Sequence, residues 1–299
     1  VTLRLNVKSV SYFNQDTFKI ISKETFLLLN NIFFIAAALT VLVGTIYPLF
    51  SEIFYNSSVS IGAPYYNFAF NLLMAPIILL MAFAPQIKWG EHQRKNNQTL
   101  YIIFISIVMM AIVHYLLGNI FFSLSIFITM PLFIKSFLVF FKKVSKDRSF
   151  FAQWLAHLSI GLFIVAAVYT EQFDYEKNIT FEKGDNNEIV LDKDTSLLLE
   201  NIKDTDLSNH QKISVDLIVM ENNLKYSLSP SKNIYQPSGQ VTNEVSTVNK
   251  YFDQYYATIS MIESDKVSIN LVYKPFINLL WISSILLVFS IFLSIMKRK

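Results

Sequence analysis

The chain has 299 residues, of which 53% are hydrophobic and 16% are charged, and its mean hydropathy is +0.41. Soluble domains of this length are more polar, so the composition excludes an ordinary soluble protein and favours an integral membrane protein. The net charge of +3 comes mostly from short basic loops and does not indicate a nucleic-acid-binding protein.

Six apolar stretches are long enough to cross a bilayer, because a helix needs about 20 mostly apolar residues to do so. In chain order they cover residues 26–50, 68–87, 100–117, 119–141, 150–168 and 276–296. The sequence therefore predicts an α-helical integral membrane protein with about six transmembrane helices.

Lysine and arginine residues gather in alternate connecting segments, as the positive-inside rule requires of cytoplasmic loops. They precede the first span and follow the second, fourth and sixth, at Arg4, Lys8, Lys19, Lys23, Lys88, Arg94, Lys95, Lys142, Lys143, Lys146, Arg148, Lys297, Arg298 and Lys299. We therefore expect both termini in the cytoplasm. The first 20 residues are too polar for a cleavable signal peptide, so we expect the first span to direct insertion unless upstream sequence is missing.

A polar insert separates the fifth and sixth spans, and this topology places it outside the membrane. Apolar and polar residues alternate at 213–219 and 267–273, which is the two-residue period of a strand. Turn-forming clusters at 184–187 and 236–239 punctuate the insert. We expect a small periplasmic antiparallel β-rich domain at 170–275. A cytoplasmic segment (1–25) and a five-helix transmembrane region (26–169) would precede it, and a last helix with a basic tail (276–299) would follow.

Four histidines are candidates for chemistry. His92 and His210 stand in polar stretches, and we expect them to be solvated surface residues. His114 falls near the outer end of the third span, where we expect interfacial hydrogen bonding, and His157 falls in the inner half of the fifth. Their depths differ by about 10 Å of helical rise. Two imidazole ligands of one metal must approach within about 4 Å, so these two histidines are poor candidates for a shared site.

His157 lies inside an apolar span, where an ionisable ring usually faces a bundle interior, a cavity or a metal. Trp154 and Gly161, three and four residues away, share its helix face. The glycine leaves room for a flat group against the backbone, and the tryptophan adds an aromatic wall. The alternative is tight helix packing at Gly161, with His157 hydrogen-bonded to a neighbouring span.

Five segments resemble, in order, segments of the CcmF/NrfE family, whose CcmF members are the haem-lyase subunit of bacterial cytochrome c maturation. Residues 151–161, with sequence Phe-Ala-Gln-Trp-Leu-Ala-His-Leu-Ser-Ile-Gly, are similar to its Leu-Ala-His-Leu-Gly segment. The other four are 22–31 continued by 44–48, then 61–67, 229–235 with Glu244, and 273–276 leading to Trp281. Three positions depart from the family pattern, namely Ser159, Ser231 and Lys274.

The resemblance covers only the C-terminal half of the family. Its tryptophan-rich periplasmic loop, which presents haem, has no counterpart, since Trp89, Trp154 and Trp281 are scattered. The chain also has no cysteine, hence no Cys-x-x-Cys-His haem attachment site of its own. We therefore expect either a fragment or one product of a split gene.

The resemblance implies a role in cytochrome c biogenesis, within the membrane haem lyase that binds haem and ligates it to apocytochrome c. His157 would be one axial ligand of a bis-histidine haem b, with Trp154 and Gly161 beside the cofactor, and the second ligand would come from the missing upstream half. No catalytic residue is identified. The implied partners are that upstream half, a haem chaperone, apocytochrome c and its thiol-reducing subunit, and membrane lipid. The implied location is the bacterial inner membrane.

Two other function classes remain open, a membrane transporter and a noncatalytic assembly scaffold. Transporters usually carry a ladder of intramembrane charges or paired broken helices. Here the clear intramembrane titratable groups are His114 and His157, with Lys135 close to an inner end. Haem content would separate the haem-lyase interpretation from both alternatives.

Overall fold

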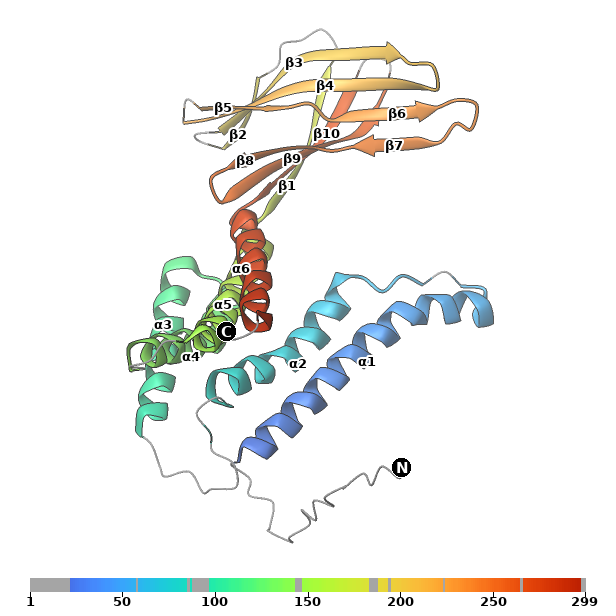
Figure 1. The fold of residues 1–299 in the computed structure, drawn as a ribbon. Coiled ribbons are helices and arrows are strands. Elements are labelled where there is room, and N and C mark those ends of the chain that lie inside the picture. The colour runs from blue at the N-terminus through green and yellow to red at the C-terminus, as the bar shows by residue number, and fades with distance from the viewer. Residues whose placement is uncertain are drawn as a thin grey trace, which may run out of the picture. The chain divides into compact units, whose positions relative to one another are not determined.

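The computed structural model describes residues 22–57, 59–84, 87, 97–142, 147–182, 188–192, 195–222, 224–263 and 266–296. Within these residues the chain forms six helices and ten strands (Figure 1). The helices are α1 (Lys23–Tyr55), α2 (Ala63–Phe83), α3 (Asn97–Leu117), α4 (Ile120–Lys142), α5 (Arg148–Phe173) and α6 (Ile277–Ile295). The strands, all between α5 and α6, are β1 (Tyr175–Glu182), β2 (Glu188–Asp192), β3 (Thr195–Asp206), β4 (His210–Glu221), β5 (Leu224–Leu228), β6 (Ser231–Tyr235), β7 (Val241–Glu244), β8 (Ser246–Lys250), β9 (Asp253–Ile262) and β10 (Lys266–Lys274).

The six predicted apolar stretches are confirmed as six helices, and each described helix is long and apolar enough to cross a membrane. Capping residues set the observed ends. α1 begins early because the Ser22 hydroxyl accepts a hydrogen bond from the backbone N–H of Thr25 at 3.3 Å. α5 begins early because Asp147 accepts one from Phe150 at 2.9 Å. α1 ends where Asn56 takes a left-handed conformation with φ of 49°.

The chain divides into two compact units, of which the first comprises residues 1–107 and 130–139. In this unit α1 and α2 pack against each other as a hairpin. The buried residues of α1 are Ala37, Gly44 and Ser51, spaced by seven positions. Small residues at this spacing form one stripe along the helix, which lets a neighbouring helix approach closely.

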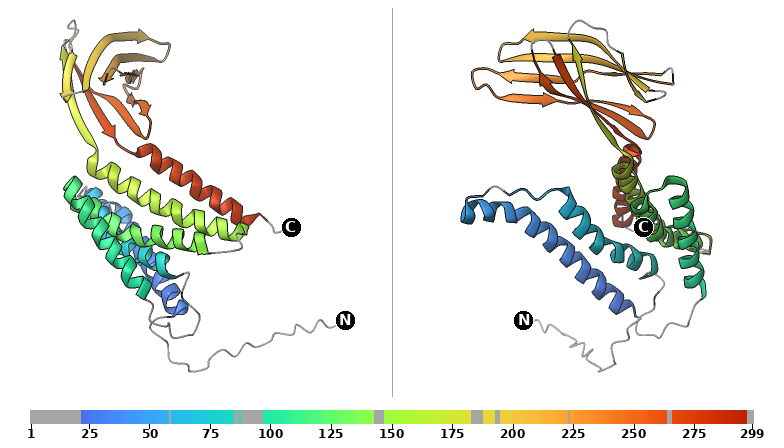
Figure 2. Two further views of the ribbon diagram at one scale, coloured as in Figure 1. Left: turned by 90° about the vertical axis from the view of Figure 1, so that its left-hand side faces the viewer. Right: turned by 180° about the vertical axis from the view of Figure 1, so that it is seen from behind.

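The second unit comprises residues 108–129 and 140–299. In it α5 and α6 run side by side (Figures 1 and 2). Small buried residues again recur every seven positions, at Ala152, Ser159 and Ala166 in α5 and at Ser283 and Ser290 in α6. Each serine hydroxyl bonds a carbonyl of its own helix, so no polar group opposes the close contact. These stripes define the α5–α6 interface.

The strands between α5 and α6 form two antiparallel sheets, which confirms the predicted β-rich domain. One sheet has the order β1-β10-β9-β8, and the other has the order β2-β3-β4-β6-β7 with β5 also paired to β4. The alternation predicted at 213–219 and 267–273 lies on β4 and β10. Its apolar members, apart from Ile213, join one core between the sheets, with fully buried Val215, Leu217, Val219, Val267, Ile269 and Leu271. The predicted turn at 236–239 is observed, with Gly239 at φ of 68°, whereas 184–187 lie outside the described residues.

The domain joins the two helices at one place. β1 follows α5 directly and pairs along its length with β10, which leads into α6, beginning with Tyr175 opposite Tyr273. The Thr170 hydroxyl, in the last turn of α5, donates to the Pro275 carbonyl at 2.6 Å. Near this bond the Tyr169 ring contacts the Phe276 ring, with 4.7 Å between centroids. The segment that enters the domain from α5 and the segment that leaves it toward α6 are therefore bonded to each other.

Candidate functional site

His157 is half-buried in the first half of α5. It stands two residues from Ser159, so it projects about 160° around the helix from the stripe that contacts α6. No hydrogen bond joins its ring to any other residue that the structure describes. The histidine therefore faces away from α6, with both ring nitrogens available to a ligand or to another chain.

The structure places Trp154 and Gly161 on the same side of α5 as His157. Phe140, at the end of α4, contacts the Trp154 ring with 4.8 Å between centroids and the Phe150 ring with 6.3 Å. The Trp154 Nε1–H is buried and has no hydrogen-bond partner among the described residues. Gly161 is buried one turn beyond the histidine. This face thus combines an unpartnered imidazole, an unpartnered indole N–H and a residue without a side chain.

Of the other histidines, His114 and His210 belong to other elements, α3 and β4, and His92 is outside the described residues. His114 is exposed in the last turn of α3. His210, on β4, is half-buried, with Nδ1 at 2.7 Å from Asn209 Oδ1 and its ring at 5.0 Å from that of Tyr235. Among the described residues no group of three or more His, Cys, Asp or Glu side chains is placed to hold a metal ion.

An apolar pocket of about 490 Å³ lies between the beginning of α5 and the end of α6. Its lining consists of Arg148, Phe151, Trp154, Leu155, Phe289 and Leu293. His157 is not among these residues. Trp154 therefore belongs both to the pocket lining and to the face that carries His157.

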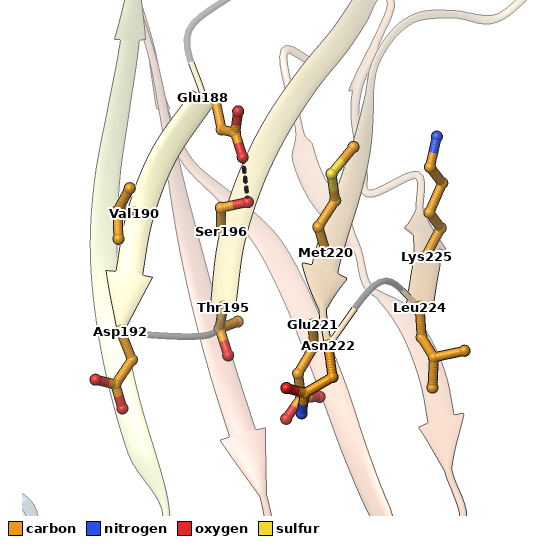
Figure 3. Close-up of a pocket in the computed structure, with 10 residues that line it drawn as sticks. All are labelled: Glu188, Val190, Asp192, Thr195, Ser196, Met220, Glu221, Asn222, Leu224 and Lys225. Carbon is orange, nitrogen blue, oxygen red and sulfur yellow. Dashed lines mark hydrogen bonds between the residues drawn. The ribbon is translucent and has the colours of Figure 1, made fainter.

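A second pocket, of about 600 Å³, lies on the β-rich domain at the ends of β2, β3, β4 and β5 (Figure 3). It is polar and carries the carboxylates of Glu188, Asp192 and Glu221. Glu188 accepts a hydrogen bond from Ser196, and Glu221 is paired with Lys250 at 2.7 Å. Because protein groups already bind these two carboxylates, their grouping does not by itself indicate a ligand site.

The structure brings together two of the family-like segments, 44–48 and 61–67, which lie apart in the sequence. An added Cβ on Gly44 of α1 would stand 2.7 Å from Cε1 of Tyr65 and 2.9 Å from Oη of Tyr66, both on α2. Tyr65 also donates a hydrogen bond to the Thr40 carbonyl at 3.2 Å. Segments 44–48 and 61–67 therefore form one contact, and the close approach of the two tyrosine rings leaves no room for a side chain at Gly44.

A second such contact holds the edge of the β-rich domain. Glu244 of β7 accepts hydrogen bonds from Ser231 at 2.7 Å, Asn233 at 2.9 Å and Lys212 at 3.0 Å. These hydrogen bonds lower the pKa of the Glu244 carboxyl from 4.5 to about 2, and the bond from Ser231 has the largest effect. The segment 229–235 and Glu244 thus act as one structural unit on neighbouring strands.

Comparisons with known proteins agree with the resemblance. No protein-family profile matches the chain. It is 25% identical over 280 residues to the cytochrome c-type biogenesis protein CcmF of Escherichia coli, a match that covers 89% of this chain and 42% of the relative. It is 25% identical over 307 residues to CcmF of Haemophilus influenzae, covering 96% and 46%. A solved structure titled cytochrome c haem lyase CcmF superimposes with a TM-score of 0.76 at 18% identity, over 93% of this chain and 46% of that one.

The chain spans less than half the length of these relatives, and it aligns with their C-terminal part. The structural match shows a shared fold of apolar helices with a β-rich domain, and the relatives identify the chain as a multi-pass membrane protein. Along most of its length the chain is therefore similar to the C-terminal part of CcmF-type cytochrome c-type biogenesis proteins.

Proposed function

We propose that this chain is the C-terminal half of a membrane haem lyase, which binds haem and ligates it to apocytochrome c. The names of the relatives and of the structural match support this assignment. The observation that carries it is His157, an ionisable side chain in a membrane helix without a partner among the described residues. An intramembrane imidazole in that state marks a functional site more often than a packing position.

His157 would serve as one axial ligand of a haem b. The surrounding residues fit a flat, largely apolar group, because Gly161 adds no side chain and the Trp154 ring provides an aromatic wall. The unpartnered Trp154 Nε1–H can donate to an acceptor at the edge of that group. The bound haem would supply an iron that carries one electron at a time.

The second axial histidine would come from the upstream half, because His114 and His210 belong to other elements, α3 and β4. A ligating imidazole normally donates its other ring N–H to an acceptor, which fixes its tautomer. No described residue accepts from His157, so we expect that acceptor also to belong to the upstream half. This chain would thus complete its site only in the assembled protein.

The proposed topology follows from the basic loops described above. Both termini and residues 1–25 would lie in the cytoplasm, residues 26–169 would form a five-helix transmembrane region, and the β-rich domain at 170–275 would lie in the periplasm. Residues 276–299 would be the last transmembrane helix and its basic tail. In that position the β-rich domain could bind apocytochrome c, its thiol-reducing subunit or the haem chaperone.

The visible absorption spectrum of this chain purified with the upstream half tests the proposal. The reduced wild-type complex should show sharp low-spin b-type bands. His157→Gly should abolish them, and free imidazole should restore them by occupying the vacated ligand position. His114→Ala is the matched control, since this histidine is exposed on another helix and its removal should leave the bands unchanged.

Two results would contradict the proposal. Bands that persist in His157→Gly without added imidazole would place the axial ligand elsewhere. A well-folded wild-type complex that contains no haem would instead favour a noncatalytic scaffold or a transporter.

A further inference from the structure

The turn between β8 and β9 carries two exposed aromatic side chains. Tyr251 and Phe252 connect Lys250 to Asp253, which pair across the hairpin. Tyr251 is 84% exposed and Phe252 is 47% exposed. Tyr251 also has φ of 52°, a left-handed conformation that glycine, asparagine and aspartate usually occupy in tight hairpins. The folding of the hairpin therefore does not explain why aromatic residues stand here.

Hydrogen bonds fix this turn to the beginning of α6. The backbone N–H of Asn278 donates to the Phe252 carbonyl at 3.0 Å, and its side-chain Nδ2 donates to the Tyr251 carbonyl, also at 3.0 Å. Asp253, next to the turn, accepts from the backbone N–H of Phe276 at 2.9 Å. Because α6 is one of the apolar helices long enough to span a membrane, its first turn marks one end of that span. The β8–β9 turn must lie at the same level.

A third exposed aromatic residue stands beside this turn. Trp281 follows Asn278 by three residues, so the two share a face of α6 and differ by about 4.5 Å along its axis. Trp281 is 61% exposed. Tyrosine and tryptophan concentrate at membrane–water interfaces, where their rings contact lipid and their polar atoms remain hydrated. The three side chains thus have the composition and the level expected of an interfacial belt.

We propose that Tyr251, Phe252 and Trp281 form one contact with the lipid–water interface, through which the β-rich domain rests on the bilayer surface. The occupant of this surface is lipid, because hydrogen bonds to a membrane helix fix the turn at the end of the apolar span. The inference depends neither on haem binding nor on which side of the membrane the domain occupies.

Spin labelling of the full chain in lipid bilayers tests this contact. The chain has no cysteine, so Tyr251→Cys would carry a single nitroxide label. Its collision rates with oxygen, which concentrates in lipid, and with a water-soluble nickel chelate report its surroundings. Val190→Cys is the matched control, because Val190 is 73% exposed on β2 of the same domain.

The ratio of oxygen to nickel collisions should be several-fold higher at position 251 than at position 190. Phe252→Cys provides a second reporter if Tyr251→Cys misfolds, and it should give the same result. Asn278→Ala in the Tyr251→Cys background should lower the ratio, because the side-chain Nδ2 of residue 278 would no longer donate to the carbonyl of residue 251.

Two results would overturn the proposal. A label at 251 or 252 that matches position 190 would place the turn in water. A label shielded from both reagents would show that protein covers it.

Discussion

Thr170→Val should destabilise the junction where the β-rich domain meets α5 and α6. Thr170 is 6% exposed, and its hydroxyl donates to the carbonyl of Pro275, which is also buried, at 2.6 Å. Valine keeps the shape of threonine and removes the donor, so the Pro275 carbonyl would remain buried without this bond. Removing one partner of a buried hydrogen bond costs about 1–3 kcal/mol.

The expected loss for Thr170→Val is about 2 kcal/mol in the free energy of unfolding, which corresponds to about 5 °C in melting temperature. Thermal unfolding of the purified chain in detergent, followed by the circular dichroism of the β-rich domain, measures it. Thr45→Val is the matched control. Its hydroxyl bonds the Val41 carbonyl of its own helix at 2.8 Å and is exposed, so the change should cost less than about 0.5 kcal/mol.

A Thr170→Val variant that unfolds at the wild-type temperature would show that this hydrogen bond does not stabilise the junction. An equal loss of stability in Thr45→Val would show that the effect belongs to the residue type and not to the junction.

Two further predictions concern the other contacts between separated segments. Gly44→Ala should cost about 1–3 kcal/mol by overpacking against Tyr65 and Tyr66, whereas Ala38→Val, at an exposed position of α1, should cost less. Equal melting temperatures for these two variants would refute the close-contact argument. Because the pKa of Glu244 is depressed, its contribution to stability is present above pH 4.5 and is lost as pH falls toward about 2. Glu244→Gln should therefore weaken the pH dependence of unfolding in that window, and an unchanged dependence would show that another group causes it.

The sequence predicted the elements of this fold well because their periodicities are strong. Six long apolar stretches became six helices, and the alternation at 213–219 and 267–273 became buried strands of two packed sheets. Element ends were less predictable, since they depend on single caps such as Ser22 and Asp147. The pairing of α5 with α6 had a readable signal, namely small residues every seven positions. That signal could have been found without the structure.

The direction in which His157 faces could be predicted only in part. Residue spacing places Trp154 and Gly161 on its side of the helix, but spacing alone does not show which side contacts α6. The stripe through Ser159 supplies that information, and it explains why serine can stand where the family often has glycine. A hydroxyl bonded to the Leu155 carbonyl at 2.7 Å remains small and internally satisfied, so α6 can still approach. Residue 159 therefore serves the helix contact, while His157 projects from the opposite face of α5.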